Sequence, residues 1–475
     1  MENGVGQLSF TFAMFPETPR GGSGAAKDEA EETQDDGSEA SRQPAPTQSQ
    51  PARKRKWHSL IDKVYALPNL QSAWERVRAN GGAPGKDGMT VQQFAVGADH
   101  RLQQLSQDLR AKTYRPQPVL RVFIPKSGGG QRPLGIPTVR DRIVQQALLQ
   151  ILSPIFEGKF SARSHGFRPG RGCATALGVV DRAVRHGYGW VVDADLQRFF
   201  DTVDHERLLT ALNEEVADSS VLRLIRSILQ AGVSLPDTAG TEPTELGTPQ
   251  GGPLSPLLAN VFLHAFDHQI VAAGYGLVRY ADDFVIFARS EGEAKDALEL
   301  ARKVLEGQLG LRLHPEKTRV VSVTCGFEFL GFRYFAGKDG TLRKEVRRQS
   351  VQRFRDRVRE LTPRLQDQSQ PKAHKATPRR LGRNRRLREM IQRLNRYLVG
   401  WHAYYQQVWT HAKYYRPFDE FVRRRFRMAV TGRVRIGWWM TRLTNPVLTD
   451  LGLHSLMTLN ERSRQEPWQP LARKS

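Results

Sequence analysis

Cysteine and long apolar runs are scarce in this sequence. Only Cys173 and Cys325 occur among its 475 residues. Two cysteines are too few for a disulfide framework or a four-cysteine zinc site, so the reducing cytoplasm is the expected compartment. No apolar run reaches the roughly 18 residues that a membrane-spanning helix needs. The first residues lack a basic segment followed by an apolar one, so we expect no secretory signal there.

Acidic residues are few relative to basic ones. Lys and Arg number 72 against 49 Asp and Glu, which gives a net charge of +23. Residues 1–50 hold 9 acidic and 3 basic residues, so the rest of the chain is more basic still. A positive field of this size favours a polyanionic partner, nucleic acid before a membrane surface.

Composition and periodicity divide the chain into five stretches. The first is poor in aromatic residues and rich in small and charged ones, which indicates disorder. Helical spacing follows, then mixed short strands and helices, then a helical stretch in which residues 341–430 hold 25 basic and 7 acidic residues. The predicted divisions are an acidic tail at 1–55 that ends in a basic run, a helical extension at 56–115, a mixed region at 116–345, basic helices at 346–430, and an irregular C-terminal tail at 431–475.

Short apolar runs between turn residues predict the strands of the mixed region. They cover 119–125, 131–136, 190–196, the two arms of a hairpin within 276–288, 318–324, 327–335 and 342–346.

Two groups of carboxylates stand at the ends of such strands. Asp195 closes one, and Asp282 and Asp283 lie between two apolar runs. A pair of adjacent acids is by itself most often an exposed turn. If the strands are neighbours, three carboxylates converge, and such oxygen ligands suit two Mg²⁺ ions, with Mn²⁺ as a substitute. Lys126 and Arg132, on either side of the turn at 127–130, could bind a triphosphate or be plain exposed charges.

Several motifs resemble, in the same order, those of reverse transcriptases encoded by group II introns, the maturase type. The resemblance covers nearly all of residues 57–430. The matching stretches are Gly166–Arg171, Ala194–Asp201, Gly247–Asn260, Tyr280–Asp283, Leu313–Thr318, Phe329–Phe332 and Leu394–Trp401.

This resemblance implies an α+β fold of the right-hand polymerase type. Fingers and a ferredoxin-like palm would occupy 116–345, and an all-helical basic thumb or maturase domain would occupy 346–430. Asp195, Asp282 and Asp283 become the catalytic metal ligands, with the carbonyl of Leu196 as a further ligand. Asp193 would share a face with Asp195 and is the rival candidate, but the spacing of the motif selects Asp195.

The resemblance also assigns residues to the substrates. Phe200 takes the place of a steric gate that would collide with a ribonucleotide 2′-hydroxyl, while Phe199 fits a core residue better. Lys126, Arg132, Gln250 and Lys317 would contact the incoming dNTP. Template and primer would contact Gly251, Phe329, Leu330 and Gly331, although a sharp turn and sheet core explain these four residues equally well.

Arginines of the basic helices are candidates for contacts with RNA phosphates. Charge runs are more often simply solvated, so this alternative stays open. The candidates are Arg383, Arg385, Arg386, Arg423, Arg424 and Arg425.

The expected function is RNA-directed DNA synthesis by two metal ions, joined to binding of group II intron RNA as a maturase that assists splicing and retrohoming. The partners would be an RNA template, a DNA primer, dNTPs, intron RNA and target DNA, with no membrane; no oligomeric state is indicated. A cysteine-bearing His-Asn-His endonuclease segment, found in many relatives, is not evident after residue 430. The alternatives are a domesticated polymerase in defence or repair and a purely RNA-binding splicing cofactor.

Overall fold

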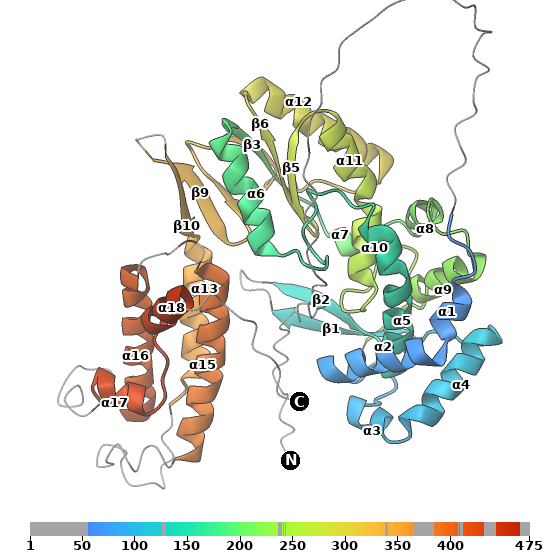
Figure 1. Cartoon of the computed structure of the whole chain (residues 1–475), viewed down its shortest axis with the longest axis horizontal. Helices are drawn as coiled ribbons and strands as arrows, with labels where there is room; N and C mark the ends of the chain where they lie inside the picture. The colour runs from blue at the N-terminus through green and yellow to red at the C-terminus, as the bar shows by residue number, and fades with distance from the viewer. Residues whose placement is uncertain are drawn as a thin grey trace, which may run out of the picture. The chain divides into compact units, whose positions relative to one another are not determined.

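The computed structural model describes residues 56–125, 130–235, 240, 242, 244–337, 341–364, 384–406, 408, 412–431 and 443–465. The expected acidic tail at 1–55 and most of the polar segment at 365–384 therefore lie outside the described residues. The chain forms two compact units, and Figure 1 labels their helices and strands. The first contains the described residues up to Ala176, Asp195–Asp282 and Glu299–Pro315, and the second contains Leu177–Ala194, Asp283–Leu298 and the described residues from Glu316 onward.

Helices make up most of the first unit. They are α1 (Ile61–Tyr65), α2 (Leu67–Asn80), α3 (Val91–Ala95), α4 (Ala98–Arg110), α5 (Val139–Glu157), α7 (Phe199–Thr202), α8 (His205–Asn213), α9 (Ser219–Leu229), α10 (Ser255–Phe262) and α11 (His264–Ala272). The central one is α5, whose Ile143, Val144, Ala147 and Leu148 are fully buried. Its first turn is capped by Thr138, which accepts a hydrogen bond from the Asp141 amide.

A three-stranded sheet accompanies these helices in the order β2-β1-β4. Strand β1 (Val119–Pro125) is antiparallel to β2 (Gln131–Ile136), with Val122 opposite Leu134, and parallel to β4 (Val233–Ser234). The predicted hairpin at 119–136 is thus confirmed in both its strands. Strand β5 (Gly276–Tyr280) also belongs to this unit.

The second unit contains two groups of strands. Strands β6 (Asp283–Ala288), β3 (Trp190–Asp195) and β7 (Arg319–Ser322) follow one another in that order in one sheet. Strands β10 (Leu342–Val346), β9 (Phe332–Ala336) and β8 (Phe327–Phe329) form the other. Helix α6 (Cys173–Arg185) leads into this unit, and α12 (Glu291–Arg302) leads out of it to a π-helix at Lys303–Gln308 that belongs to the first unit.

The expected single strand at 327–335 is wrong, because the structure has two strands there. Leu330 and Gly331 form a turn between β8 and β9, with φ angles of +48° and +83°. The carbonyl of Leu330 accepts a hydrogen bond from the hydroxyl of Tyr404 at 2.9 Å. This contact comes from a helix about 70 residues further along the chain, so the apolar run itself does not reveal the turn.

Five α-helices form the remainder of the second unit among the described residues: α13 (Arg348–Leu361), α15 (Arg385–Tyr405), α16 (Arg416–Thr431), α17 (Asn445–Asp450) and α18 (Leu456–Gln465). Phe354, Leu394, Trp401 and Phe426 pack in their common core. The prediction of helices within 346–430 is therefore confirmed for α13, α15 and α16.

The expectation of an irregular C-terminal tail at 431–475 is wrong for residues 445–465. Leu448 and Leu456, on α17 and α18, are buried in the same core. Asp419 of α16 caps α18 by accepting hydrogen bonds from the amides of Leu456 and Met457 at 2.7 and 3.1 Å. Both helices are shorter than three turns, too short for a clear apolar period.

Candidate active site

A tight turn presents the two adjacent acids. Strand β5 ends at Tyr280, Ala281 and Asp282 form the turn, and Asp283 opens β6. Ala281 has a φ of +59°, in the left-handed region. The prediction of two strands joined by a turn that carries Asp282 and Asp283 is confirmed.

Asp195 and Asp282 interact within the first unit. Burial raises the pKa of the Asp282 carboxyl, and the negative charge of Asp195 raises it further, whereas the Arg132 and Arg279 guanidinium groups lower it. Asp195 ends β3, and its carbonyl accepts a hydrogen bond from the His314 amide at 2.8 Å. Two carboxylates from separate parts of the chain therefore share one partly buried site.

Leu196, the residue after Asp195, also contacts the chain segment around His314. It is 4% exposed and forms an isolated antiparallel bridge with Leu313. The backbone that follows Asp195 is thus fixed by the chain segment around residues 312–314, to which Gln197 also donates through its amide.

The chemistry of these groups fits a hard divalent cation. Asp195 and Asp282 supply carboxylate oxygens, and Asp283 follows directly in the chain. Within the part of the chain that the structure describes, no three His, Cys, Asp or Glu side chains gather into a group that would hold a metal ion. The three-carboxylate site therefore stays a prediction.

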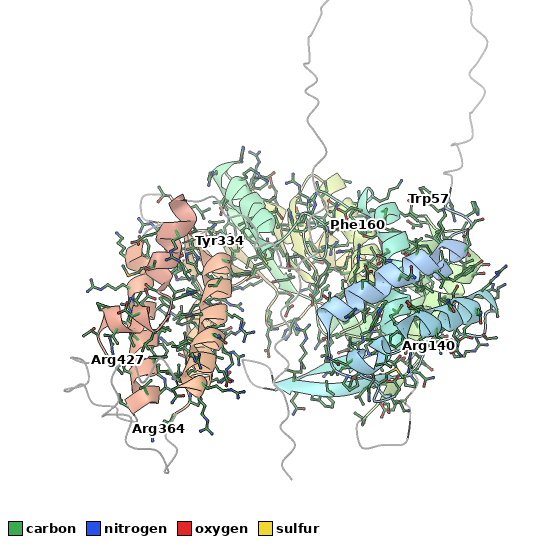
Figure 2. The ribbon with its side chains drawn as sticks, turned by 60° about the horizontal axis from the view of Figure 1, so that its bottom comes forward. Trp57, Arg140, Phe160, Tyr334, Arg364 and Arg427 are labelled. Atoms are coloured by element: carbon green, nitrogen blue, oxygen red, sulfur yellow. The ribbon has the colours of Figure 1, made fainter. Side chains whose placement is uncertain are left out.

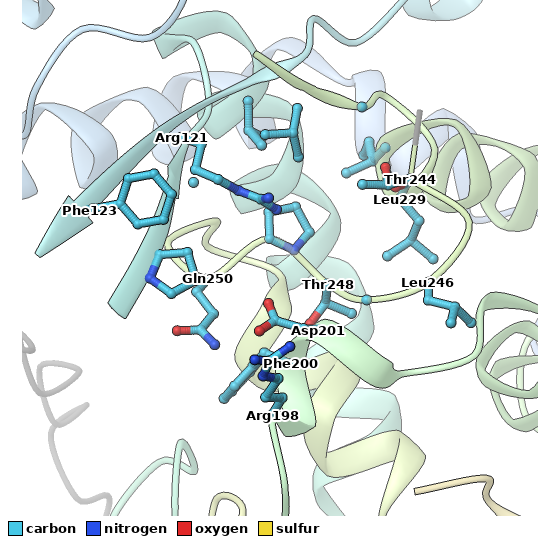
Figure 3. A pocket seen from close by; sticks show the side chains of 18 of the residues that line it. Arg121, Phe123, Arg198, Phe200, Asp201, Leu229, Thr244, Leu246, Thr248 and Gln250 are labelled. Carbon is cyan, nitrogen blue, oxygen red and sulfur yellow. The ribbon is translucent and has the colours of Figure 1, made fainter. Parts of the chain in front are cut away.

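Arg132 links the β1–β2 hairpin to the loop that precedes α10. Its Nε donates to Oε1 of Gln250 at 2.8 Å. Gln250 also lines a cavity of about 500 Å³, together with Phe200, Arg121, Phe123 and Leu246 among others (Figure 3). The structure therefore brings together Arg132, Phe200 and Gln250, three of the residues expected to contact a dNTP.

Phe199 and Phe200 have different surroundings despite their adjacency. Phe199 is 2% exposed and packs against Phe262, with ring centroids 6.4 Å apart. Phe200 is 8% exposed and borders the cavity. This difference agrees with the interpretation of Phe199 as the core residue of the two.

Gly251 lies against the backbone of β2. Its φ is +130°, and a Cβ at this position would be 2.5 Å from the carbonyl oxygen of Gly135. The amide of Gly135 donates to the carbonyl of Gln250 at 2.8 Å. Close approach of β2 is thus sufficient to explain why residue 251 is a glycine.

The remaining strand residues of the prediction lie in the second unit. Asp193, the rival of Asp195, forms an ion pair with Arg319 at 2.8 Å across β3 and β7. Lys317 is exposed, and Phe329 is buried at the end of β8. Lys126 and Arg383 lie outside the described residues.

The arginines of the basic helices differ in their contacts, and Figure 2 labels one of them, Arg427 on α16. Arg385 forms an exposed i,i+4 ion pair with Glu389, and Arg386 is exposed. On α16, Arg424 is exposed and Arg423 half-buried. Arg425 donates to the carbonyl of Thr362 at 3.3 Å, and its burial lowers the pKa of its guanidinium.

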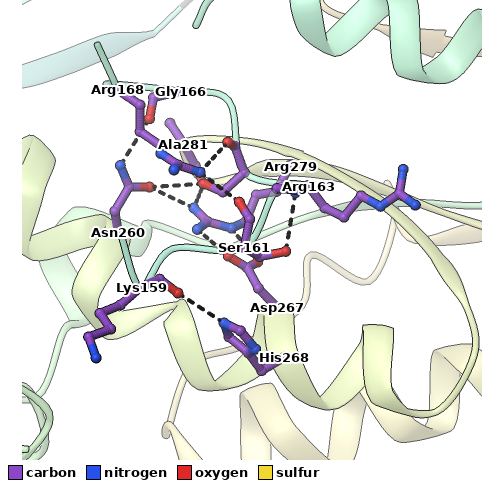
Figure 4. Close-up of polar contacts among 12 residues, drawn as sticks. Lys159, Ser161, Arg163, Gly166, Arg168, Asn260, Asp267, His268, Arg279 and Ala281 are labelled. Carbon is purple, nitrogen blue, oxygen red and sulfur yellow. Dashed lines mark hydrogen bonds and ion pairs between the residues drawn. The ribbon is translucent and has the colours of Figure 1, made fainter. Parts of the chain in front are cut away.

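A buried polar network behind the acidic turn was missed from the sequence. Arg279 contacts Asp267, Asn260 and the carbonyl of Ala281 (Figure 4). The available signal was an arginine inside an apolar strand, directly before the acidic motif.

Two family models match the chain. The reverse transcriptase (RNA-dependent DNA polymerase) model matches residues 124–334, and the group II intron, maturase-specific domain model matches residues 371–443. No helix in the described part of the chain is both long and apolar enough to cross a membrane.

Similar proteins include Protein YkfC of Escherichia coli K12, 36% identical over 53% of this chain and 75% of that protein. Group II intron-encoded protein LtrA of Lactococcus lactis subsp. cremoris is 30% identical over 57% of this chain, and the match spans 56% of LtrA. A solved chain of a partial Cas6-RT-Cas1–Cas2 complex is 28% identical over 52% of this chain and 41% of that one, with a TM-score of 0.35.

The carboxylate-bearing turn, the order of the motifs and the two matched domains agree with one another. This chain belongs to the family of group II intron-encoded reverse transcriptases and maturases.

Proposed function

We propose that this protein is an RNA-directed DNA polymerase in which Asp195, Asp282 and Asp283 hold two Mg²⁺ ions, or Mn²⁺ in their place. The domains would be fingers and palm at 116–345 and a thumb or maturase domain at 346–430, in a right-hand arrangement. The observation that carries the proposal is the shared, partly buried site of Asp195 and Asp282, within the same unit as the Arg132–Gln250 contact.

Each of these residues has a distinct task in DNA synthesis. Bound metal ions would activate the primer 3′-hydroxyl and stabilise the pyrophosphate that leaves. Arg132 would bind the triphosphate through its guanidinium, for which it would exchange its present partner Gln250. Phe200, at the edge of the cavity, would exclude the 2′-hydroxyl of a ribonucleotide.

Binding of intron RNA is the second part of the proposal. It is supported by the match of residues 371–443 to the maturase-specific domain and by the arginines of α15 and α16. The protein would bind the RNA of its own intron to assist splicing, and then use RNA as template at a DNA target during retrohoming. Template, primer, dNTPs and target DNA are the partners that this cycle requires.

Primer extension by the purified chain tests the first part. With primed RNA template, dNTPs and Mg²⁺, we expect the wild type to extend the primer and Asp282→Asn to lose extension by at least about a hundredfold, because a metal ligand is removed. Asp193→Asn is the control, since Asp193 is the rival candidate on β3, the strand that Asp195 ends, and it pairs with Arg319. An inactive wild type, or an Asp282→Asn protein as active as wild type, would contradict the assignment.

Splicing separates the two activities. We expect Asp282→Asn to keep its affinity for intron RNA and its ability to promote splicing, because the basic helices are unchanged. A wild type that promotes splicing but never extends a primer would identify the protein as a splicing cofactor without polymerase activity.

A further inference from the structure

An ion pair without solvent contact lies directly behind the acidic turn. Arg279 on β5 and Asp267 on α11 have fully buried side chains, and Nε and Nη2 of Arg279 each donate to one oxygen of the Asp267 carboxylate at 2.6 Å. Such a pair is weak evidence for stability, because apolar side chains of similar volume often stabilise a core as well or better. Its presence calls for another explanation.

The remaining terminal nitrogen of Arg279 reaches the turn itself. Nη1 donates to Oδ1 of Asn260 at 3.0 Å and to the carbonyl oxygen of Ala281 at 2.8 Å (Figure 4). Ala281 has a left-handed conformation, with φ of +59°, which residues with a side chain rarely adopt. Arg279 thus holds the strained residue that immediately precedes Asp282.

The loop before α6 holds the same turn from another side. The amide of His165 donates to the carbonyl of Arg279 at 2.8 Å. Gly166 lies so close to the turn that a Cβ there would be 2.3 Å from the nitrogen of Ala281. Asn260 joins both parts, since its Nδ2 donates to the carbonyl of Gly166 at 2.9 Å. The backbone of the turn is therefore enclosed by fixed groups.

We propose that Arg279 is a positioning residue, kept buried by the charge of Asp267, which uses its fork of N–H groups to fix the Ala281–Asp282 turn before a metal ion binds. This inference rests on the proposed function, in which Asp282 is a metal ligand. Groups that orient a ligand from behind typically change metal affinity or activity about 10–100-fold when they are removed. Arg279 supplies that support without contacting metal or substrate.

Replacing Arg279 and Asp267 together gives a folded protein in which the positioning role of Arg279 can be tested. Arg279→Met combined with Asp267→Leu removes both buried charges and fills the space with apolar atoms, so neither residue leaves an unpaired charge. Tyr114→Phe serves as the control for lost stability, because it removes a buried 2.6 Å hydrogen bond to Asp141 away from the turn. Thermal midpoints of both proteins establish that they are folded at the assay temperature.

The main measurement is Mn²⁺ binding in the absence of nucleic acid. The electron paramagnetic resonance signal of the free ion monitors this binding. We expect the dissociation constant for Mn²⁺ to be about tenfold higher or more in the paired variant than in wild type. The comparison concerns the Mn²⁺ site that is lost in Asp282→Asn. The kcat of the paired variant in primer extension should fall, while its affinity for RNA should equal that of wild type. Tyr114→Phe should match wild type in both Mn²⁺ affinity and kcat. Equal Mn²⁺ affinity in the paired variant and wild type would overturn the inference.

Arg279→Lys distinguishes geometry from charge. Lysine keeps the positive charge, but one ammonium group cannot serve Asp267, Asn260 and Ala281 in the same planar fork. We expect Arg279→Lys to bind Mn²⁺ as weakly as the paired variant, and full affinity in Arg279→Lys would contradict a positioning role. If instead Asp282→Asn itself bound Mn²⁺ and extended primers like wild type, the proposed function would fail, and this inference with it.

Discussion

At the scale of single residues, two neighbouring phenylalanines illustrate how position decides role. Phe199 and Phe200 contact each other edge to face, with ring centroids 5.1 Å apart. Phe199 turns toward α10, where it meets Phe262, and Phe200 turns toward the cavity. Removing the first ring would leave a void in the core, and removing the second would enlarge the cavity.

Phe200→Ala should therefore raise ribonucleotide incorporation by roughly tenfold or more relative to deoxyribonucleotides, because the clash with the 2′-hydroxyl is lost. The measurement is the ratio of kcat/KM for a ribonucleoside and a deoxyribonucleoside triphosphate of the same base. Phe200→Tyr keeps the ring and should retain discrimination. An unchanged ratio in Phe200→Ala would retire Phe200 as the gate.

The acidic turn could be predicted from the sequence, whereas its support could not. Apolar residues on both sides of Asp282 and Asp283 indicate a turn directly, because the information is local. Arg279 reads as an exposed strand residue unless one knows that Asp267, on a preceding helix, meets it in the core. The position of Gly251 likewise depends on β2, which lies more than 100 residues earlier in the chain.

Among the helices and strands, one carboxylate serves two helix ends. Asp218 accepts hydrogen bonds from the amides of Leu60 and Ile61 at the start of α1, at 2.7 and 2.9 Å. It also accepts from Ser220 and Val221 at the start of α9, at 2.9 and 3.2 Å. Burial raises the pKa of this carboxyl, but the four backbone N–H groups together lower it below its ordinary value.

Asp218→Ala should release both helix ends and lower the free energy of unfolding by about 2 kcal/mol. Because the pKa is lower in the folded state, the stabilisation is present above the ordinary carboxyl pKa of about 4 and is lost as pH falls through the folded value. Amide hydrogen exchange of the segments around residues 60 and 220 measures this at pH 7 and below pH 4. The difference between wild type and variant should shrink in acid.

Asp204→Ala is the matched comparison, since Asp204 caps α8 alone by accepting from the Arg207 amide at 2.9 Å. It should affect one helix end only. A pH-independent effect of Asp218→Ala would contradict the role of the ionised carboxylate.

The periodic helices could be predicted, but the short elements could not. Helix α15 has 21 residues, and its apolar face repeats often enough to mark it. Helix α17 has 6 residues and is stabilised by burial of Leu448 rather than by a repeating pattern. Strands β8 and β9 read as one apolar strand in the sequence, but Leu330 and Gly331 between them have positive φ angles and form a turn.

At the scale of the whole molecule, the net charge of +23 is distributed unevenly. Helices α13, α15 and α16 carry arginines on their outer faces, while their inner faces are apolar. Not every one of these arginines is free to meet a phosphate, because Arg425 bonds to the carbonyl of Thr362.

The salt dependence of RNA affinity should distinguish the arginines that contact phosphates from those that stabilise the fold. We expect Arg423→Gln combined with Arg424→Gln to weaken RNA binding most at low salt and to reduce the slope of log K against log salt by about 1 per lost phosphate contact. Arg425→Gln should mainly lower thermal stability. RNA titrations between about 50 and 200 mM salt provide the test. An unchanged slope in the double variant would leave Arg423 and Arg424 as solvated surface charges.

The path of the chain between the two units has a consequence for synthesis on the ribosome. The chain changes unit at residues 176/177, 194/195, 282/283, 298/299 and 315/316. Strand β3 must wait for both of its sheet neighbours, β6 and β7, which are translated after about 90 and 125 further residues. Translation adds about 5–20 residues per second. Val191 and Val192, which are buried in the finished sheet, therefore stay without a neighbouring strand for several seconds. Nascent chains of this protein therefore expose an unpaired apolar strand until β6 has been translated.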